Sequence, residues 1–155
     1  MKRNKNLIEL SRDHHHGLLL GWKIKQGLKK QVAVIEIIKY VAYFAQEALF
    51  KHFEAEENQI LVYLLPDDEY GKRVMKEHTE IRTLIQQLIS SKPKDSAGLM
   101  RLAEVLEAHI RYEEREFFPY LESTLAAEEL EIIGKEIDHL HVPYIENYPH
   151  EFWAN

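Results

Sequence analysis

Residues 32–65 read VAVIEIIKYVAYFAQEALFKHFEAEENQILVYLL, and they contain neither Gly nor Pro until Pro66 ends the run. Apolar residues recur within this run at steps of three and four, which is the spacing of one face of an α-helix. They are Ile38, Val41, Ala45 and Ala48. The next positions on the same face are His52 and Glu56. The segment therefore predicts a long amphipathic helix whose buried face carries an imidazole and, one turn later, a carboxylate.

Two later segments have the same pattern. In a helix predicted over 96–124, the apolar face continues into His109 and Glu113, and in a helix predicted over 68–90 it surrounds His78. The apolar positions are Leu99, Leu102, Leu106, Phe117 and Tyr120 in the first segment and Val74, Ile81, Ile85 and Leu88 in the second. Two of the three segments thus carry the motif H-x-x-x-E, whose two polar residues lie on one helix face.

A further helix, predicted over 8–28, contains three neighbouring histidines, His14, His15 and His16. At about 100° per residue, the apolar side of this helix points along His14. That side is defined by Leu7, Leu10, Leu18, Trp22, Ile24 and Leu28. His15 lies roughly a quarter turn away, and His16 points to the far side. We therefore expect His14 to face the core, with His15 as the alternative.

Short connections between the helices predict the fold. The expected helices cover 8–28, 32–65, 68–90, 96–124 and 126–141, with a loop at 90–94 and a kink at Pro119. Asp67 or Asp68 can cap the third helix, and Asp95 or Ser96 the fourth. Since short loops make successive helices antiparallel, we expect an all-α, up-down-up-down four-helix bundle with a short fifth C-terminal helix. We expect one domain over 1–155, with its bundle core at about 7–125 and the extra helix and an aromatic tail at 126–155.

Composition narrows the classes of function. The chain of 155 residues has no Cys, which excludes disulfides, thiolate metal sites and Cys nucleophiles. No apolar run is long enough to span a membrane, and the basic N-terminus is not followed by a secretory signal pattern. The net charge of −6 does not favour nucleic acid as a partner. We therefore expect a cytoplasmic protein without nucleic-acid or membrane partners.

The polar residues on the apolar faces form a set of candidate metal ligands. Two H-x-x-x-E pairs and two single histidines would bring four imidazoles and two carboxylates together from four helices. Burying two carboxylates costs several kcal/mol each unless they are paired or bind a metal. A carboxylate can bridge two ions, so the set suits two metals, with iron preferred and manganese or zinc possible. The candidates are His14 (alternate His15), His52, Glu56, His78, His109 and Glu113.

These residues resemble the ligand pattern of the hemerythrin-like, or HHE cation-binding, domains. The similarity extends over about 7–125 and includes the surroundings of the ligands, such as 10–14, 52–57 and 113–119. The resemblance implies a four-helix bundle with a non-haem di-iron centre, oxo- or hydroxo-bridged, that binds dioxygen or a related small molecule. It also implies that Glu56 and Glu113 are bridging carboxylates and that the four histidines are terminal ligands.

The chain departs from the pattern of the oxygen-carrying members in two places. Those members have two histidines four residues apart on the third helix, whereas Val74 and Arg82 flank His78 at that spacing here. They have an Asp five residues after the histidine of the fourth helix, where this chain has Glu114 directly after Glu113. These departures favour a more open site than that of a reversible oxygen carrier.

Three functions remain in competition. The preferred one is a protein that binds or senses dioxygen, nitric oxide or iron at the di-iron site. The first alternative is a di-iron redox enzyme that reduces peroxide or nitric oxide. The second is a structural metal-binding bundle, which six ligands disfavour because structural zinc is usually four-coordinate.

Several other polar and aromatic residues have more ordinary interpretations. We expect His139 and His141 to be surface residues or partners of a helix C-terminus, with a capping role over the bundle as the alternative. Glu57, Glu80 and Glu114 are candidates to accept hydrogen bonds from the ligand imidazoles, but solvent exposure is the default expectation for each. The aromatic residues of the tail are expected to pack on the bundle or to contact another subunit.

Overall fold

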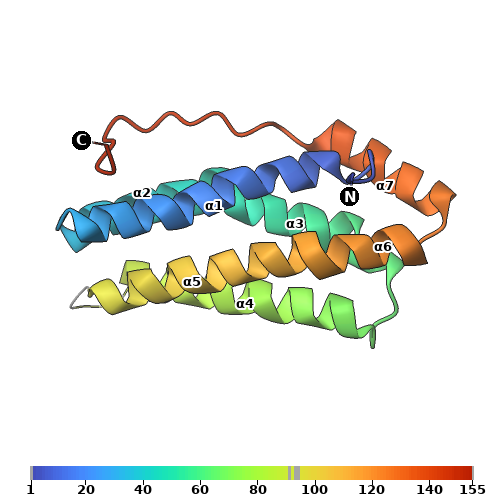
Figure 1. The fold of residues 1–155 in the computed structure, drawn as a ribbon, viewed down its shortest axis with the longest axis horizontal. Coiled ribbons are helices and arrows are strands. Elements are labelled where there is room, and N and C mark those ends of the chain that lie inside the picture. Colours follow the sequence, from blue (N-terminus) through green and yellow to red (C-terminus); the bar gives the residue numbers. More distant parts are fainter. Residues whose placement is uncertain (1, 91, 93–94, 155) are drawn as a thin grey trace.

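Four long helical rods run antiparallel in the computed structural model, which describes residues 2–90, 92 and 95–154. A fifth helix packs at one end of the bundle (Figure 1). The first and third rods are α1 (Ile8–Lys29) and α4 (Glu69–Ser90), and the fifth helix is α7 (Ala127–Leu140). The described residues contain no strand. The predicted all-α, up-down-up-down bundle with a short fifth helix is confirmed.

The second rod is longer and less regular than a single α-helix. It consists of α2 (Val34–Phe44), a π-helical segment (Ala45–Leu49), α3 (Phe50–Gln59) and a short 3₁₀ turn (Leu61–Tyr63). The prediction of one unbroken helix over 32–65 is therefore wrong in detail. A π-helical turn accommodates one extra residue, so Leu49 is buried where the 3.6-residue period predicted Ala48.

The fourth rod also contains a π-helical segment. It runs through α5 (Ser96–Tyr112), the π-helical residues Glu113–Phe117 and α6 (Phe118–Thr124). The irregularity lies directly before the predicted kink at Pro119. Pro119 has no N–H to donate to a backbone carbonyl one helical turn before it. In this turn the Glu114 carbonyl accepts a hydrogen bond from the Arg3 guanidinium instead, at 2.7 Å.

Aspartates begin two of the rods, as the sequence predicts. The Asp68 side chain accepts a hydrogen bond from the Gly71 amide just inside α4, and the Asp95 side chain accepts one from the Gly98 amide in α5, each at 3.0 Å. Of the predicted loop at 90–94, residues 91, 93 and 94 lie outside the described part of the chain.

The buried apolar side chains form two clusters. One contains Leu20, Ile81 and Leu106, and the other contains Leu10, Val74 and Phe117. On each rod, the buried histidine lies between a member of the first cluster and a member of the second. The four rods therefore carry their buried polar residues at the same level of the bundle, as a polar layer between two apolar ones.

After α7 the chain is extended and runs back along the bundle toward the far end (Figure 1). Phe152 and Trp153 are buried there against Tyr40. The Lys23 ammonium lies 4.0 Å from the centre of the Trp153 ring and donates a hydrogen bond to the Tyr40 hydroxyl at 2.9 Å. Of the two roles expected for the aromatic tail, packing on the bundle or contact with another subunit, the structure shows the first.

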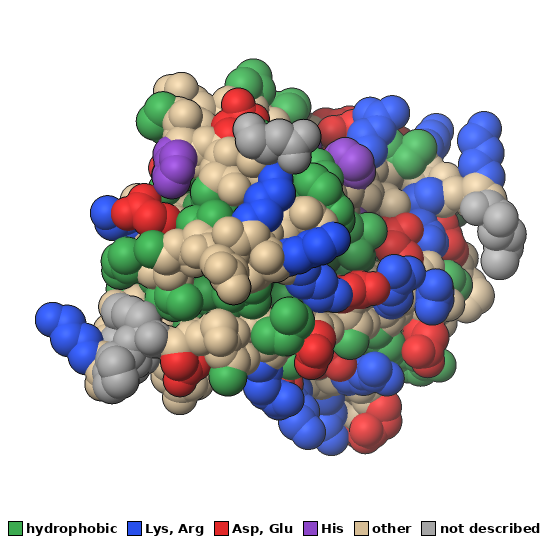
Figure 2. All heavy atoms as spheres, turned by 60° about the vertical axis from the view of Figure 1, so that its left-hand side comes forward, with side chains coloured by type: hydrophobic (Ala, Val, Ile, Leu, Met, Phe, Trp, Pro, Cys, Tyr) green, Lys and Arg blue, Asp and Glu red, His purple; other side chains and the backbone are tan. Residues whose placement is uncertain are grey.

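The surface is charged and mixed in sign. Figure 2 shows Lys, Arg, Asp and Glu side chains spread over the face it presents, with apolar side chains between them. Among the helices of the described residues, none combines the length and the apolar character needed to cross a membrane.

Candidate metal centre

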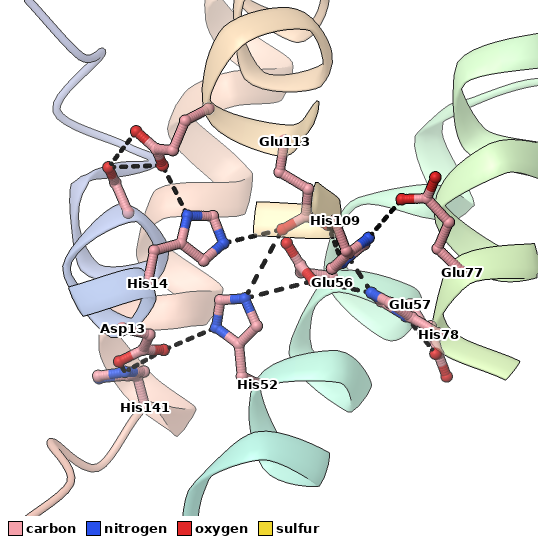
Figure 3. A network of polar contacts seen from close by, with 12 residues as sticks. Asp13, His14, His52, Glu56, Glu57, Glu77, His78, His109, Glu113 and His141 are labelled. Atoms are coloured by element: carbon pink, nitrogen blue, oxygen red, sulfur yellow. Dashed lines mark hydrogen bonds and ion pairs between the residues drawn. The ribbon is translucent and has the colours of Figure 1, made fainter. Parts of the chain in front are cut away.

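Six buried side chains meet in the polar layer, and they form two overlapping groups of possible metal ligands. The first group contains His14 and His52, the second contains His78 and His109, and Glu56 and Glu113 belong to both. Within each group, one ligand atom from every residue lies within 4.8 Å of the others. All six side chains are buried, the two carboxylates completely. Figure 3 shows them pointing toward one another from the four rods.

The Nε2 atom of every imidazole faces a carboxylate oxygen. His14 Nε2 lies 2.8 Å from Glu113 Oε1, and His109 Nε2 lies 3.2 Å from Glu113 Oε2. On the other carboxylate, Glu56 Oε1 lies 3.3 Å from His52 Nε2 and 3.1 Å from His78 Nε2. Glu113 also lies 3.9 Å from His52 Nε2 and 3.7 Å from His78 Nε2. Each carboxylate therefore contacts imidazoles of both groups, which is the arrangement of a bridging ligand.

Local helix geometry explains why these side chains meet. His52 and Glu56, like His109 and Glu113, are four residues apart and lie on one helix face. The first and fourth rods pack closely beside them. Gly17 makes this possible, since a Cβ atom at that position would lie only 2.6 Å from Ile110 Cδ1 of the fourth rod. Glu113 begins the π-helical segment of the fourth rod, and such segments are frequent at functional sites.

Each imidazole also donates its Nδ1–H outward to a second carboxylate. His14 donates to Glu114 at 2.7 Å, His52 to Asp13 at 2.9 Å, His78 to Glu57 at 2.6 Å and His109 to Glu77 at 2.7 Å. Figure 3 labels three of these four carboxylates. Such partners fix the ring orientation and the tautomer of a metal-binding histidine, leaving the Nε2 lone pair for the metal. We call Asp13, Glu57, Glu77 and Glu114 the outer carboxylates.

Three of the outer carboxylates are anchored by arginines. Arg82 donates to both oxygens of Glu57, at 2.7 and 3.2 Å. Arg73 donates to Glu77 at 2.9 Å, and Arg3 lies 3.3 Å from Glu114. Burial raises the pKa of each of these carboxyls, but its imidazole and, to a lesser extent, its arginine lower the pKa below the usual value, which keeps the carboxylate charged and accepting.

Aromatic rings pack against two of the imidazoles. The His78 ring stacks on Phe53, with ring centres 3.9 Å apart, and the His14 ring stacks on Phe118 at 5.4 Å. Both Phe side chains are fully buried. The two rings belong to different apolar clusters, and they leave the imidazoles that they contact little freedom to rotate.

Electrostatics favour protonated imidazoles in the metal-free protein. Burial lowers the pKa of His78, but Glu113, Glu56 and Glu57 outweigh this effect and raise it to about 10. Burial likewise lowers the pKa of His109, while Glu113 and Glu77 raise it to about 9. In the opposite sense, burial raises the pKa of Glu113, but the surrounding histidines hold it well below its usual value. A cation that enters must therefore replace protons.

The incomplete hydrogen bonding of the polar layer also fits a bound metal. Four buried atoms of the layer have no hydrogen-bond partner among the described residues. They are His52 Nε2, His109 Nε2, Glu56 Oε2 and Glu113 Oε2. All four belong to the two groups and point inward. Leaving such atoms unpaired in a buried site is costly, and cations bound in the two groups would satisfy them.

A cavity of about 390 Å³ reaches the layer from one side. Its inner wall includes His14, His52 and His109. Apolar side chains from the bundle and the C-terminal segment form most of the remaining wall, among them Phe44, Leu49, Leu106, Ile110, Leu140 and Val142. The cavity gives a small uncharged molecule a route to the imidazoles.

The structure brings together all six residues that the sequence selected as ligand candidates, and it decides between two alternatives. His14 lies in the polar layer, whereas His15 is exposed beside His16. The default expectation of solvent exposure was wrong for Glu57 and Glu114, which are partly buried and hold imidazoles. Glu80 holds no imidazole: its side chain is 39% exposed, and its carboxylate pairs with Arg101.

Other contributors were not found in the sequence. Asp13 and Glu77 hold His52 and His109, but nothing in their spacing distinguishes them from surface acids. His141 is the C-cap residue of α7, but it is not the surface residue that we preferred: its side chain is only 12% exposed and contacts Asp13. This contact with α1 agrees better with the alternative, in which His141 covers part of the bundle.

Comparison with protein families gave one match. The family profile described as "Hemerythrin HHE cation binding domain" matches residues 6–121 and, in a second overlapping match, residues 72–142. Comparisons with curated proteins and with solved structures gave no match. Together the two matched ranges contain all six residues of the polar layer.

Proposed function

This chain belongs to the hemerythrin HHE cation-binding family, and on that premise we propose that it is a non-haem di-iron protein that binds or senses dioxygen, nitric oxide or iron. Cation binding follows from the family and from the buried His and Glu residues. The identity of the cation as iron, the number of two ions and the small-molecule ligand are our proposal. The observation that carries it is the pair of overlapping ligand groups with two shared carboxylates.

We assign the ligands from these groups. His14 and His52 would bind one ion, His78 and His109 the other, and Glu56 and Glu113 would bridge the two. Imidazole and carboxylate donors without thiolate suit iron, and manganese and zinc are the other metals that such a set accepts. Two protein imidazoles and two shared carboxylates per ion leave coordination positions for a small ligand. Bound iron would supply those positions and the electrons for reaction with an oxidant.

The chain's own residues keep the imidazoles ready to bind. The outer carboxylates hold a proton on each Nδ1 atom, so that Nε2 faces the metal position. Phe53 and Phe118 hold two of the rings in place. The cavity, whose wall is mostly apolar but includes Glu47, Lys51 and Glu54, would admit a small molecule to three of the imidazoles. Since a water molecule takes about 30 Å³ of liquid volume, this cavity is ample for a diatomic ligand.

Metal analysis of the purified protein, combined with spectroscopy, tests the proposal. We expect about two irons per chain and a change in the visible spectrum when oxygen or nitric oxide is added to the reduced protein. The variant His52→Ala with Glu113→Ala should take up no iron. A matched control, His15→Ala with Glu54→Ala, removes an exposed histidine and an exposed glutamate from the first two rods and should leave the iron content unchanged.

The result can contradict the proposal in separate ways. Iron content that is unchanged in the ligand variant would refute the assigned site. One zinc per chain without colour would favour a structural metal. Sustained turnover of hydrogen peroxide or nitric oxide by the iron-loaded protein would make it the redox enzyme of the first alternative.

A further inference from the structure

We propose that His141, at the end of α7, is a positioning residue of the metal centre, which it reaches through Asp13 and His52. This inference rests on the proposed function and adds to it an element outside the four-helix bundle. It concerns only how one ligand is held.

The contacts form a continuous chain from the C-terminal segment to the polar layer. His141 Nε2 lies 2.9 Å from Asp13 Oδ1 and 3.0 Å from Asp13 Oδ2. Asp13 Oδ2 in turn accepts the Nδ1–H of His52 at 2.9 Å. Figure 3 shows the three side chains in this order. The His141 and Asp13 side chains are only 12% and 18% exposed, so water competes weakly for these hydrogen bonds.

Comparison among the four outer carboxylates shows that Asp13 is the exception. Arginines from the N-terminal segment and α4 anchor Glu57, Glu77 and Glu114. In the part of the chain that the structure describes, Asp13 has no arginine partner, and the neighbouring Arg12 pairs with Glu9 at 2.8 Å instead. His141 occupies the place that arginine has on the other three. The outer carboxylate Asp13 is therefore anchored by a histidine at the end of α7, where the other three are anchored by arginines.

The location of His141 links this anchor to the cavity. Ile137, Leu140, His141 and Val142 all line the cavity that reaches the imidazoles. Ile137 is buried, but Leu140 is 55% exposed and Val142 is 81% exposed, so apolar packing does little to hold the wall beyond Ile137. At this end of α7, the His141–Asp13 contact attaches the wall to α1. It fixes the His52 ring on one side and the cavity wall on the other.

Nuclear magnetic resonance of the full chain loaded with Co²⁺ tests the proposal directly. Co²⁺ is paramagnetic and accepts imidazole and carboxylate ligands, so each bound imidazole should give a strongly shifted, exchangeable Nδ1–H signal. Asp13→Ala assigns the signal of His52. In His141→Ala we expect that one signal to shift and to exchange faster with water, while the other three stay in place. Co²⁺ affinity should fall by up to about tenfold.

Two further variants separate positioning from general damage. His141→Arg supplies the anchor that the other outer carboxylates have, and it should restore the His52 signal and the affinity. His139→Ala removes an exposed histidine from the same end of α7 and should change neither.

Each outcome decides a different claim. If the chain binds Co²⁺ but His141→Ala leaves all four signals and the affinity unchanged, the positioning role is overturned and the proposed metal site stands. If His141→Ala disturbs all four signals equally and His141→Arg restores none, His141 acts only on overall folding, which also overturns the role. If the unaltered chain gives no shifted signals because it takes up no Co²⁺, the proposed site fails, and the inference fails with it.

Discussion

The Nε2 atom of His14 lies 2.8 Å from the Oε1 atom of Glu113, although 99 positions separate the two residues in the chain. The contact joins the first rod of the bundle to the fourth. The contact between His78 of α4 and Glu56 of α3 likewise joins two rods, whereas His52–Glu56 and His109–Glu113 are contacts within one rod. The candidate ligands therefore converge only when the bundle is assembled, and metal binding must be coupled to folding.

Metal should accordingly stabilise the bundle. With Zn²⁺ as a redox-inactive probe, we expect Tm to rise with metal concentration. At a free concentration of about 100 times Kd, the free energy of unfolding should increase by roughly 2.7 kcal/mol for each ion bound. Glu113→Ala should abolish the rise, whereas Glu116→Ala, which removes an exposed carboxylate from the same π-helical segment, should preserve it. Scanning calorimetry measures both, and an equal rise in the two variants would show that Zn²⁺ binds elsewhere.

The pH dependence of stability should have opposite signs with and without metal. In the metal-free protein the folded-state pKa is raised to about 10 for His78 and about 9 for His109, above the ordinary value of 6.5. The stability they contribute is therefore fully present below pH 6.5 and is lost as the pH rises through 9 to 10. Zn²⁺ affinity should instead increase over this range, because binding displaces those protons. Thermal unfolding in chelator and competition titrations with Zn²⁺ measure the two trends. If the stability of the metal-free protein and the Zn²⁺ affinity both rose with pH, these imidazoles would not be protonated in the metal-free protein.

Removing an outer arginine should weaken metal binding without removing a ligand. Arg82 donates two hydrogen bonds to Glu57, which holds His78. We expect Arg82→Ala to lower Zn²⁺ affinity by about tenfold, the lower end of the effect of losing such a partner. Arg101→Ala is the matched control, since Arg101 pairs with Glu80 on the surface. Competition with a chromogenic chelator gives both affinities, and equal values for the two variants would show that Glu57 does not need its anchor.

Two glycines of α1 should respond differently to alanine. A Cβ atom at Gly21 would meet only the Ala103 carbonyl oxygen, at an ordinary 3.7 Å. Gly21→Ala should therefore stabilise the protein by up to about 1 kcal/mol through helix propensity. At Gly27 the new atom would lie 2.8 Å from Phe152 and 2.9 Å from Ile37. Gly27→Ala should be net destabilising by about 1 kcal/mol, because overpacking outweighs the gain in propensity.

Urea unfolding compares these two variants with the unaltered chain. The chain has a second tryptophan, the half-exposed Trp22, so the variants are made in a Trp22→Phe background. Trp153 fluorescence at low urea should then report displacement of the tail in Gly27→Ala alone, since Trp153 packs beside Phe152. If Gly27→Ala were the more stable of the two, the tail would not be packed tightly against α1.

The amino-acid sequence by itself determined the helices and most of their buried faces, although Leu18 and Trp22, which we placed on the apolar side of the first helix, are 39% and 48% exposed. The 3.6-residue period placed His52, Glu56, His78, His109 and Glu113 on apolar faces, and the same period selected His14 over His15. These inferences are local: they need only the direction of a side chain around its own helix axis. Because a buried carboxylate without a partner is so costly, the pattern alone also predicted a buried ligand set.

Only the tertiary structure decided what holds those residues in place. Asp13, Glu77 and His141 lie at positions where a polar residue is ordinary, and each acquires its role from a partner on another element, 39, 32 and 128 positions away. The π-helical segments Ala45–Leu49 and Glu113–Phe117 also departed from the period. The physical reason is the same in each case: these features are set by how neighbouring rods pack, and the periodicity of one helix carries no information about the residues that will face it.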